Sequence, residues 1–177
     1  MLINNHQKIF VSTVFYLFVM EHSVKVGLSF GLCSGVITTL GLIVGLHSGT
    51  NSKLAVIGGI LTIAVADSLS DALGIHISEE AENIHTAKEV WVSTFSTFFS
   101  KLFFALSFVI PVLLLDLKRA VIVSIIWGLG ILSLFSFMIA KEQNVKPYRV
   151  IAEHLVIASS VIILSRYIGE WIAITFG

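Results

Sequence analysis

The sequence predicts an all-α, polytopic membrane protein, with five transmembrane helices after an N-terminal interfacial helix. Of its 177 residues, 56% are hydrophobic and only 12% are charged. The mean hydropathy of the chain is +0.96, and a water-soluble domain could not expose a surface of that composition. Several uncharged runs are also long enough to cross about 30 Å of hydrocarbon at about 1.5 Å per helical residue.

Each helix is predicted from its own run of apolar residues. The run over 9–20 is too short to cross a bilayer, so we expect an interfacial helix there. The third predicted span carries Lys101 and Pro111, and the last has polar ends. No linker rich in Pro, Ser or Gly interrupts the chain, which indicates a single transmembrane domain over 1–177. The predicted spans cover about residues 26–46, 54–77, 93–115, 120–140 and 148–174.

The distribution of basic residues predicts the orientation. The side of the predicted membrane opposite the N-terminus carries only Lys53, Lys118 and Arg119, with Arg166 near its boundary, whereas the N-terminal side carries seven basic residues. Basic loops stay in the cytoplasm, so the N-terminus is predicted to be cytoplasmic and the C-terminus outside. The 11 basic and 11 acidic residues balance, which argues against a nucleic-acid partner. The basic residues on the N-terminal side are Lys8, Lys25, Lys88, Lys101, Lys141, Lys146 and Arg149.

The first span carries two ridges of glycine, each with a spacing of four residues. Such ridges let helix backbones approach closely in lipid. They indicate either packing within the chain or a seam between the subunits of a homodimer. A ridge also lets a transport path pass beside the helix backbone. The hydroxyls of Ser34 and Thr38, near the middle of the span, would line that path. The ridges are Gly27, Gly31 and Gly35, followed by Gly41, Gly45 and Gly49.

Two acids lie deep in the second span. Asp67 and Asp71 are four residues apart and therefore share one helix face. An ionised Asp at the bilayer centre costs on the order of 3 kcal/mol. Three remedies are open: a proton on one carboxylate, a basic partner such as Lys101, or a bound cation. A site where metal and proton compete would combine the first and the third.

Further polar groups are predicted to extend this site toward the cytoplasm. Lys101, Glu153 and His154 begin their spans on the same side as the two acids, so they are expected at a similar depth. All five groups would then converge in a polar vestibule open to the cytoplasm, and Glu153 and His154 would line the transport path. His76 is either an interfacial residue or a ligand. The segment after it is either a solvated helix face or a funnel that gathers cations, with Mn²⁺ or Fe²⁺ favoured by its oxygen and imidazole groups. The funnel residues are Glu79, Glu80, Glu82 and His85.

Two stretches resemble a known family. "SGVITTLGLIVGL" (34–46) and "GGILTIAVADSLSDALGIHISEE" (58–80) are similar to the first two helices of the vacuolar iron transporter family. The resemblance covers about residues 24–90. It implies five spans, a cytoplasmic N-terminus, a homodimer, and export of Fe²⁺ or Mn²⁺ from the cytosol in exchange for protons. No resident cofactor is implied.

The chain departs from the family pattern at several positions. Ser34 stands where the family has an Asp before a glycine, here Gly35. Leu69 and Leu73 stand near the family's Met and Glu of the second helix. The family's long acidic insert is reduced to residues 79–89.

Three classes of function follow. The leading prediction is a divalent-metal transporter that binds the ion at Asp67 and Asp71 and exchanges it for protons, not an enzyme. A membrane scaffold or regulator, whose buried charges only specify assembly, is the second. The third is a metal-dependent phosphotransferase: "DSLSD" (67–71) matches the DxxxD half of the CDP-alcohol phosphotransferase motif, but the DGxxAR half is absent.

Overall fold

The computed structural model describes the backbone of residues 5–177 and the side chains of residues 22–177. Every regular element in this part of the chain is a helix. Five segments are long and apolar enough to cross a membrane: His22–Thr50, Lys53–Glu82, Ala87–Leu114, Leu117–Glu142 and Pro147–Phe176. The predicted all-α, multi-pass membrane fold is therefore confirmed. The helices are α1 (Asn5–Thr50), α2 (Lys53–Glu82), α3 (Ala87–Ser107), α4 (Val109–Leu114), α5 (Leu117–Glu142) and α6 (Pro147–Phe176).

Two boundaries differ from the sequence-based prediction. The backbone over 9–20 is not a separate helix, because α1 continues through it without a break. The third span is divided at Phe108 into α3 and α4. Pro111 has no backbone N–H to donate to the carbonyl four residues earlier, that of Ser107, which explains the interruption. The side chain of Ser107 also forms two hydrogen bonds: its hydroxyl donates to the Phe104 carbonyl and accepts from Trp127 Nε1.

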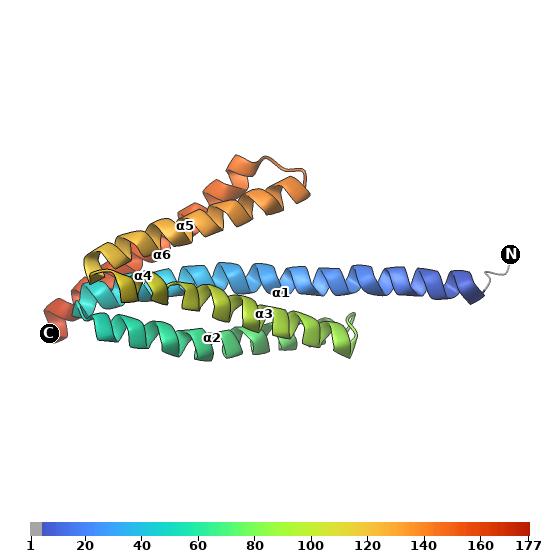
Figure 1. Cartoon of the computed structure of the whole chain (residues 1–177), viewed down its shortest axis with the longest axis horizontal. Helices are drawn as coiled ribbons and strands as arrows, with labels where there is room; N and C mark the ends of the chain where they lie inside the picture. The colour runs from blue at the N-terminus through green and yellow to red at the C-terminus, as the bar shows by residue number, and fades with distance from the viewer. Residues whose placement is uncertain (1–4) are drawn as a thin grey trace.

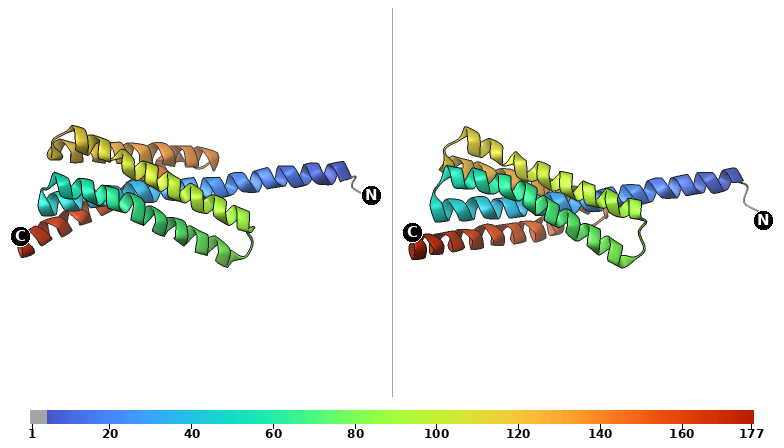
Figure 2. Two further views of the ribbon diagram at one scale, coloured as in Figure 1. Left: turned by 60° about the horizontal axis from the view of Figure 1, so that its bottom comes forward. Right: turned by 90° about the horizontal axis from the view of Figure 1, so that it is seen from below.

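The first helix is the centre of the molecule. It contacts α2 and α3 on one side and α5 and α6 on the other (Figures 1 and 2). We call the end that carries the connections at 83–86 and 143–146 the N-proximal face, and the other end the C-proximal face. Toward the N-proximal face, α5 and α6 diverge from α1 (Figure 1). A cavity of about 660 Å³ lies in this wedge, and an ion pair of 2.5 Å between Lys25 and Glu142 crosses its mouth.

Both glycine ridges of α1 pack against helices of the same chain. A Cβ atom on Gly31 would lie 2.5 Å from the Thr97 carbonyl oxygen of α3, and one on Gly41 would lie 2.8 Å from Val161 of α6. The ridges therefore permit close contacts of α1 with α3 and with α6. Of the two alternatives for the ridges, packing within the chain is present, and the homodimer stays a prediction.

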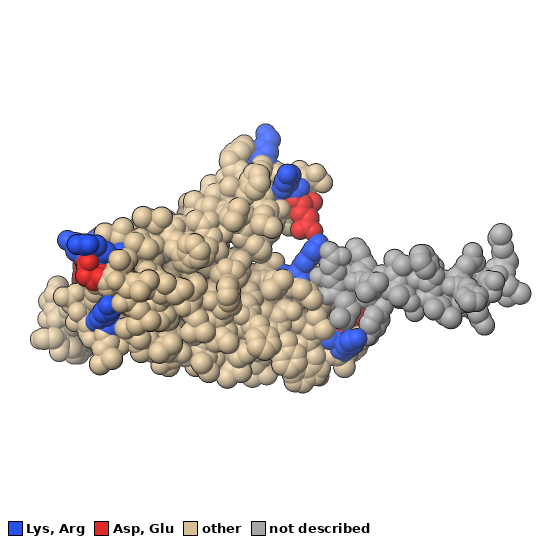
Figure 3. Space-filling model, viewed as in Figure 1, with Lys and Arg blue, Asp and Glu red and all other residues tan. Residues whose placement is uncertain are grey.

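Charged side chains gather at the two ends of the molecule. Figure 3 shows Lys, Arg, Asp and Glu near both ends and a broad uncharged surface between them, as expected where lipid covers the protein. Asp67, Asp71 and Lys101 lie away from both ends, and the Lys101 side chain is only 1% exposed. It belongs to the interior and must be left out of the charge count that predicts the orientation.

The connection between α2 and α3 is defined by two helix caps. Asn83 ends α2 in the left-handed conformation, with φ of 53°. Thr86 caps α3 through a capping box: its hydroxyl accepts from the Glu89 N–H, and the Glu89 carboxylate accepts from the Thr86 N–H at 2.7 Å. This arrangement satisfies two backbone donors that a helix start leaves unpaired.

The cap yields a first prediction. Changing Thr86 to Ala removes the side-chain acceptor and should lower the free energy of unfolding by about 1 kcal/mol. Unfolding of the detergent-solubilised protein, followed by circular dichroism, measures this change. Thr86→Ser keeps the hydroxyl and is the matched control; equal losses in the two variants would show that the capping bond contributes nothing.

Candidate functional site

The strongest concentration of buried charge lies at the middle of three neighbouring spans. Asp67 is 14 residues beyond Lys53 at the start of α2, which ends at Glu82 (67 − 53 = 14). Lys101 is likewise 14 residues beyond Ala87, in the span that ends at Leu114 (101 − 87 = 14). Both charges are therefore about 21 Å from the start of their spans, far from either end.

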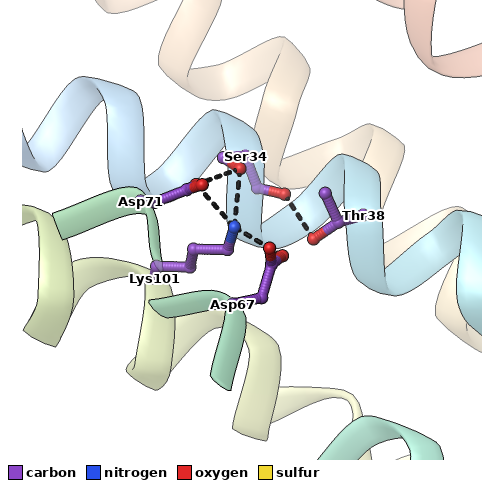
Figure 4. Close-up of polar contacts among 5 residues, drawn as sticks. All are labelled: Ser34, Thr38, Asp67, Asp71 and Lys101. Atoms are coloured by element: carbon purple, nitrogen blue, oxygen red, sulfur yellow. Dashed lines mark hydrogen bonds and ion pairs between the residues drawn. The ribbon is translucent and has the colours of Figure 1, made fainter. Parts of the chain in front are cut away.

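Lys101 joins two carboxylates and a hydroxyl. Its Nζ atom lies 2.5 Å from Oδ2 of Asp67 and 2.5 Å from Oδ2 of Asp71. The same ammonium donates to Ser34 Oγ at 2.9 Å, and Ser34 donates in turn to Asp71 Oδ2 at 2.6 Å. Figure 4 shows the side chains of α1, α2 and α3 pointing toward one another at this point. We refer to Ser34, Asp67, Asp71 and Lys101 as the charge cluster.

Of the three remedies for the two acids, the structure contains the basic partner. Lys101 pairs with both carboxylates. With all three groups ionised, the charge cluster carries a net charge of −1. The Asp67 side chain is 33% exposed and that of Asp71 is 20% exposed, against 1% for Lys101. The carboxylates thus remain accessible from outside the chain, while the lysine is enclosed.

The glycine ridge explains how a lysine reaches this depth. A Cβ atom on Gly35 would lie 3.0 Å from the Lys101 carbonyl oxygen and 3.3 Å from its Cγ. The absent side chain leaves space for the lysine stem against the α1 backbone. The residue before Lys101, Ser100, donates through Oγ to the Leu28 carbonyl of α1 at 3.0 Å. These contacts fix the register of α3 on α1 and place the ammonium beside Ser34.

The two predicted path residues of α1 have different surroundings. Ser34 belongs to the charge cluster, and its predicted role in lining a transport path stays a prediction. Thr38 donates to the Ser34 carbonyl of its own helix at 2.9 Å (Figure 4). This local bond is a common arrangement for a helical Thr, and it gives no sign of a path at Thr38.

Glu153 and His154 do not join the charge cluster. Glu153 is exposed on α6. The His154 ring lies 2.7 Å from Ser136 Oγ of α5, and it borders the wedge-shaped cavity between α1 and α5–α6. The expected vestibule of five converging groups is therefore wrong: depth alone does not bring two side chains together when their helices pack against different sides of α1.

The acidic segment after the cluster is also divided. Glu79 turns inward, where Ser93 donates to its carboxylate. Glu82 pairs with His85 at 3.4 Å across the helix end, and Glu80 is exposed. Because α2 ends at Glu82, His85 lies beyond the helix that carries the three glutamates. The four predicted funnel residues therefore do not line one helix face, and the predicted single funnel is not formed.

No group of three or more His, Cys, Asp or Glu side chains in residues 22–177 is arranged to hold a metal ion. Asp67 and Asp71 both contact one atom, Lys101 Nζ, at mid-span. A cation could reach both of them only by displacing Lys101 Nζ. The second pair of acids that a phosphotransferase site requires is not beside them in the described side chains.

Sequence reasoning found both aspartates but missed the connection from Ser34 to Lys101. A signal was present in retrospect, since Lys101 follows Ser93 and Thr97 at steps of four, the same spacing as the glycines of α1. Comparison with known proteins adds no assignment: no protein-family model, curated protein or solved structure matches this chain.

Proposed function

We propose that this chain is a proton-coupled cation transporter and that the charge cluster is the site where cation and proton exchange. The observation that supports the proposal is two partly exposed carboxylates sharing one enclosed ammonium at the middle of the spans. A site with net charge −1 attracts one further positive charge, either a proton or a cation. Intramembrane ionisable groups of this kind commonly mark ion or proton pathways.

Lys101 acts in this proposal as an internal substitute for the cargo. When no cation is bound, the ammonium neutralises part of the carboxylate charge. A divalent cation that binds Asp67 and Asp71 takes the place of Nζ, and protonation of the carboxylates then weakens its binding. Carboxylate and hydroxyl oxygens suit Mn²⁺ or Fe²⁺ better than Cu⁺, so these two ions, exported from the cytosol, are the cargo we propose.

Transport by purified protein tests the proposal. In proteoliposomes with a pH gradient, the wild-type chain is expected to move Mn²⁺ or Fe²⁺. Asp67→Asn removes one of the two charged ligands and should lower this flux at least about tenfold, since a lost charged contact of more than about 1.4 kcal/mol changes an equilibrium tenfold. Glu153→Gln, which changes an exposed carboxylate outside the cluster, should keep the wild-type flux.

The opposite outcomes discriminate between functions. Full flux in the Asp67→Asn variant would remove the charge cluster from the mechanism. A wild-type chain that moves neither ion, together with cluster variants that lose their fold, would favour the scaffold instead. That second function has one observation in its favour, because Lys101 already ties three helices together without any ion.

A further inference from the structure

Two adjoining cavities lie between α2 and α3, away from the charge cluster. The first, of about 330 Å³, is bordered mainly by apolar side chains such as Leu69, Leu73, Phe95 and Phe99. The second, of about 200 Å³, lies at the N-proximal connection and is bordered by Glu80, Asn83 and His85. His76 and Trp91 border both. Together they form a groove with an apolar part at membrane depth and a polar part at the N-proximal face.

The apolar part is built on a ladder of aromatic rings. Trp91 and Phe95 stack with centroids 5.4 Å apart, and Phe95 and Phe99 stack at 6.4 Å. All three rings are more than half exposed and face outward from α3. A flat, outward-facing aromatic wall beside Leu69 and Leu73 offers a continuous contact surface to a hydrocarbon chain lying along the helix.

The polar part contains a histidine with one unpartnered nitrogen. Thr94 has a single hydroxyl proton, which it donates to the Val90 carbonyl at 2.6 Å. The 3.0 Å contact between Thr94 Oγ1 and His76 Nδ1 must therefore take its proton from the imidazole. In the neutral ring, Nε2 of His76 is then a hydrogen-bond acceptor, and no bond from residues 22–177 reaches it.

The other groups of the polar part also favour a hydrogen-bond donor with positive charge. Glu80 forms no ion pair with any side chain of residues 22–177. His85 is engaged by Glu82. Trp91 contacts the His76 ring edge-on at a centroid distance of 4.7 Å. A carboxylate and an imidazole acceptor, set beside the half-exposed Trp91, together match a primary ammonium group.

We infer that this groove binds a phospholipid with a primary amine head group, phosphatidylethanolamine, from the N-proximal leaflet. The ammonium donates to Glu80 and to His76 Nε2, and one acyl chain lies along the aromatic ladder. A choline head group has no N–H to donate, and an anionic glycerol head group is repelled by Glu80. Head-group selection therefore depends on Glu80, and chain binding depends on the ladder.

Quenching of Trp91 by brominated lipids tests this site. The chain has three tryptophans, so Trp127→Phe/Trp171→Phe leaves Trp91 as the only one. In vesicles of phosphatidylcholine that contain a small fraction of brominated lipid, brominated phosphatidylethanolamine should bind next to Trp91 with roughly fivefold preference over brominated phosphatidylcholine or phosphatidylglycerol. Glu80→Gln should abolish the preference, whereas Glu82→Gln, which changes a carboxylate outside the groove, should keep it.

Equal quenching by all three lipids would mean annular lipid only and would overturn the inference. If the tryptophan variants fail to fold, native mass spectrometry of the wild-type chain gives a second measurement. Phosphatidylethanolamine should then remain bound to the wild-type protein and to Glu82→Gln, but not to Glu80→Gln. These results are independent of cation transport, so the groove and the proposed function can fail separately.

Discussion

Replacing Lys101 with Met is expected to destabilise the protein by about 3–5 kcal/mol. The change keeps a long side chain but leaves Asp67 and Asp71, at the middle of their spans, without the enclosed ammonium that they share. Removing one partner of a buried ion pair has costs of this size, because the remaining charge loses its compensation. Unfolding of the protein in mixed micelles by a denaturing detergent, followed by circular dichroism, gives the difference.

Two matched variants make this measurement specific. The triple change Lys101→Met/Asp67→Asn/Asp71→Asn removes all three charges of the cluster. It should restore most of the stability that Lys101→Met loses, since replacing a complete buried ion network is often nearly neutral. Arg166→Met breaks an exposed pair with Glu170 on α6 and should leave the free energy of unfolding close to that of the wild type. A Lys101→Met protein as stable as the wild type would show that the acids do not need the ammonium.

Changing Gly31 to Ala is expected to destabilise the contact between α1 and α3 by about 1–3 kcal/mol. The added methyl group would lie 2.5 Å from the Thr97 carbonyl oxygen and 2.9 Å from Ser100 Cβ. Neither the backbone oxygen nor a Cβ atom can move without shifting its helix, so α3 must move away from α1. The shift would also displace Lys101 from Ser34.

Gly74 is the matched control for Gly31, because a Cβ atom there would meet nothing within 4 Å. Gly74→Ala should cause no loss of stability and could raise it by up to about 1 kcal/mol through the better helix propensity of Ala. Both variants are compared by the same detergent unfolding. Equal effects at the two positions would mean that the glycine ridge is not needed for close packing.

The two predictions are linked through the charge cluster. Gly31 and Gly35 allow the α3 backbone to approach, and the approach brings the lysine stem against α1. A variant that separates the helices should therefore impair transport as well as stability, if the proposed function is correct. Flux is measured in the Gly31→Ala and Gly74→Ala proteins. Lower flux in Gly31→Ala alone would show that the ridge is needed for transport; equal flux would show that it is needed only for stability.

Some features of the site followed from local sequence alone. Hydropathy predicted the spans, because each must present about 20 apolar residues to the bilayer wherever its neighbours lie. The spacing of Asp67 and Asp71 predicted a shared face, since a helix places residues four apart on one side. The cost of two acids in lipid showed that some partner was needed. Each of these conclusions depends on one helix and its solvent.

The choice of partner was decided only by the tertiary structure. Whether Lys101, a proton or a cation neutralises the acids depends on the register of α3 against α1 and α2, which a pattern within one helix does not specify. Glu153 and His154 were expected at the depth of the acids but lie on α6, which packs elsewhere on α1. The sequence by itself determined that this membrane protein holds buried charge at mid-span; the contacts between helices determined which charges meet, because only packing sets the distance between side chains far apart in the chain.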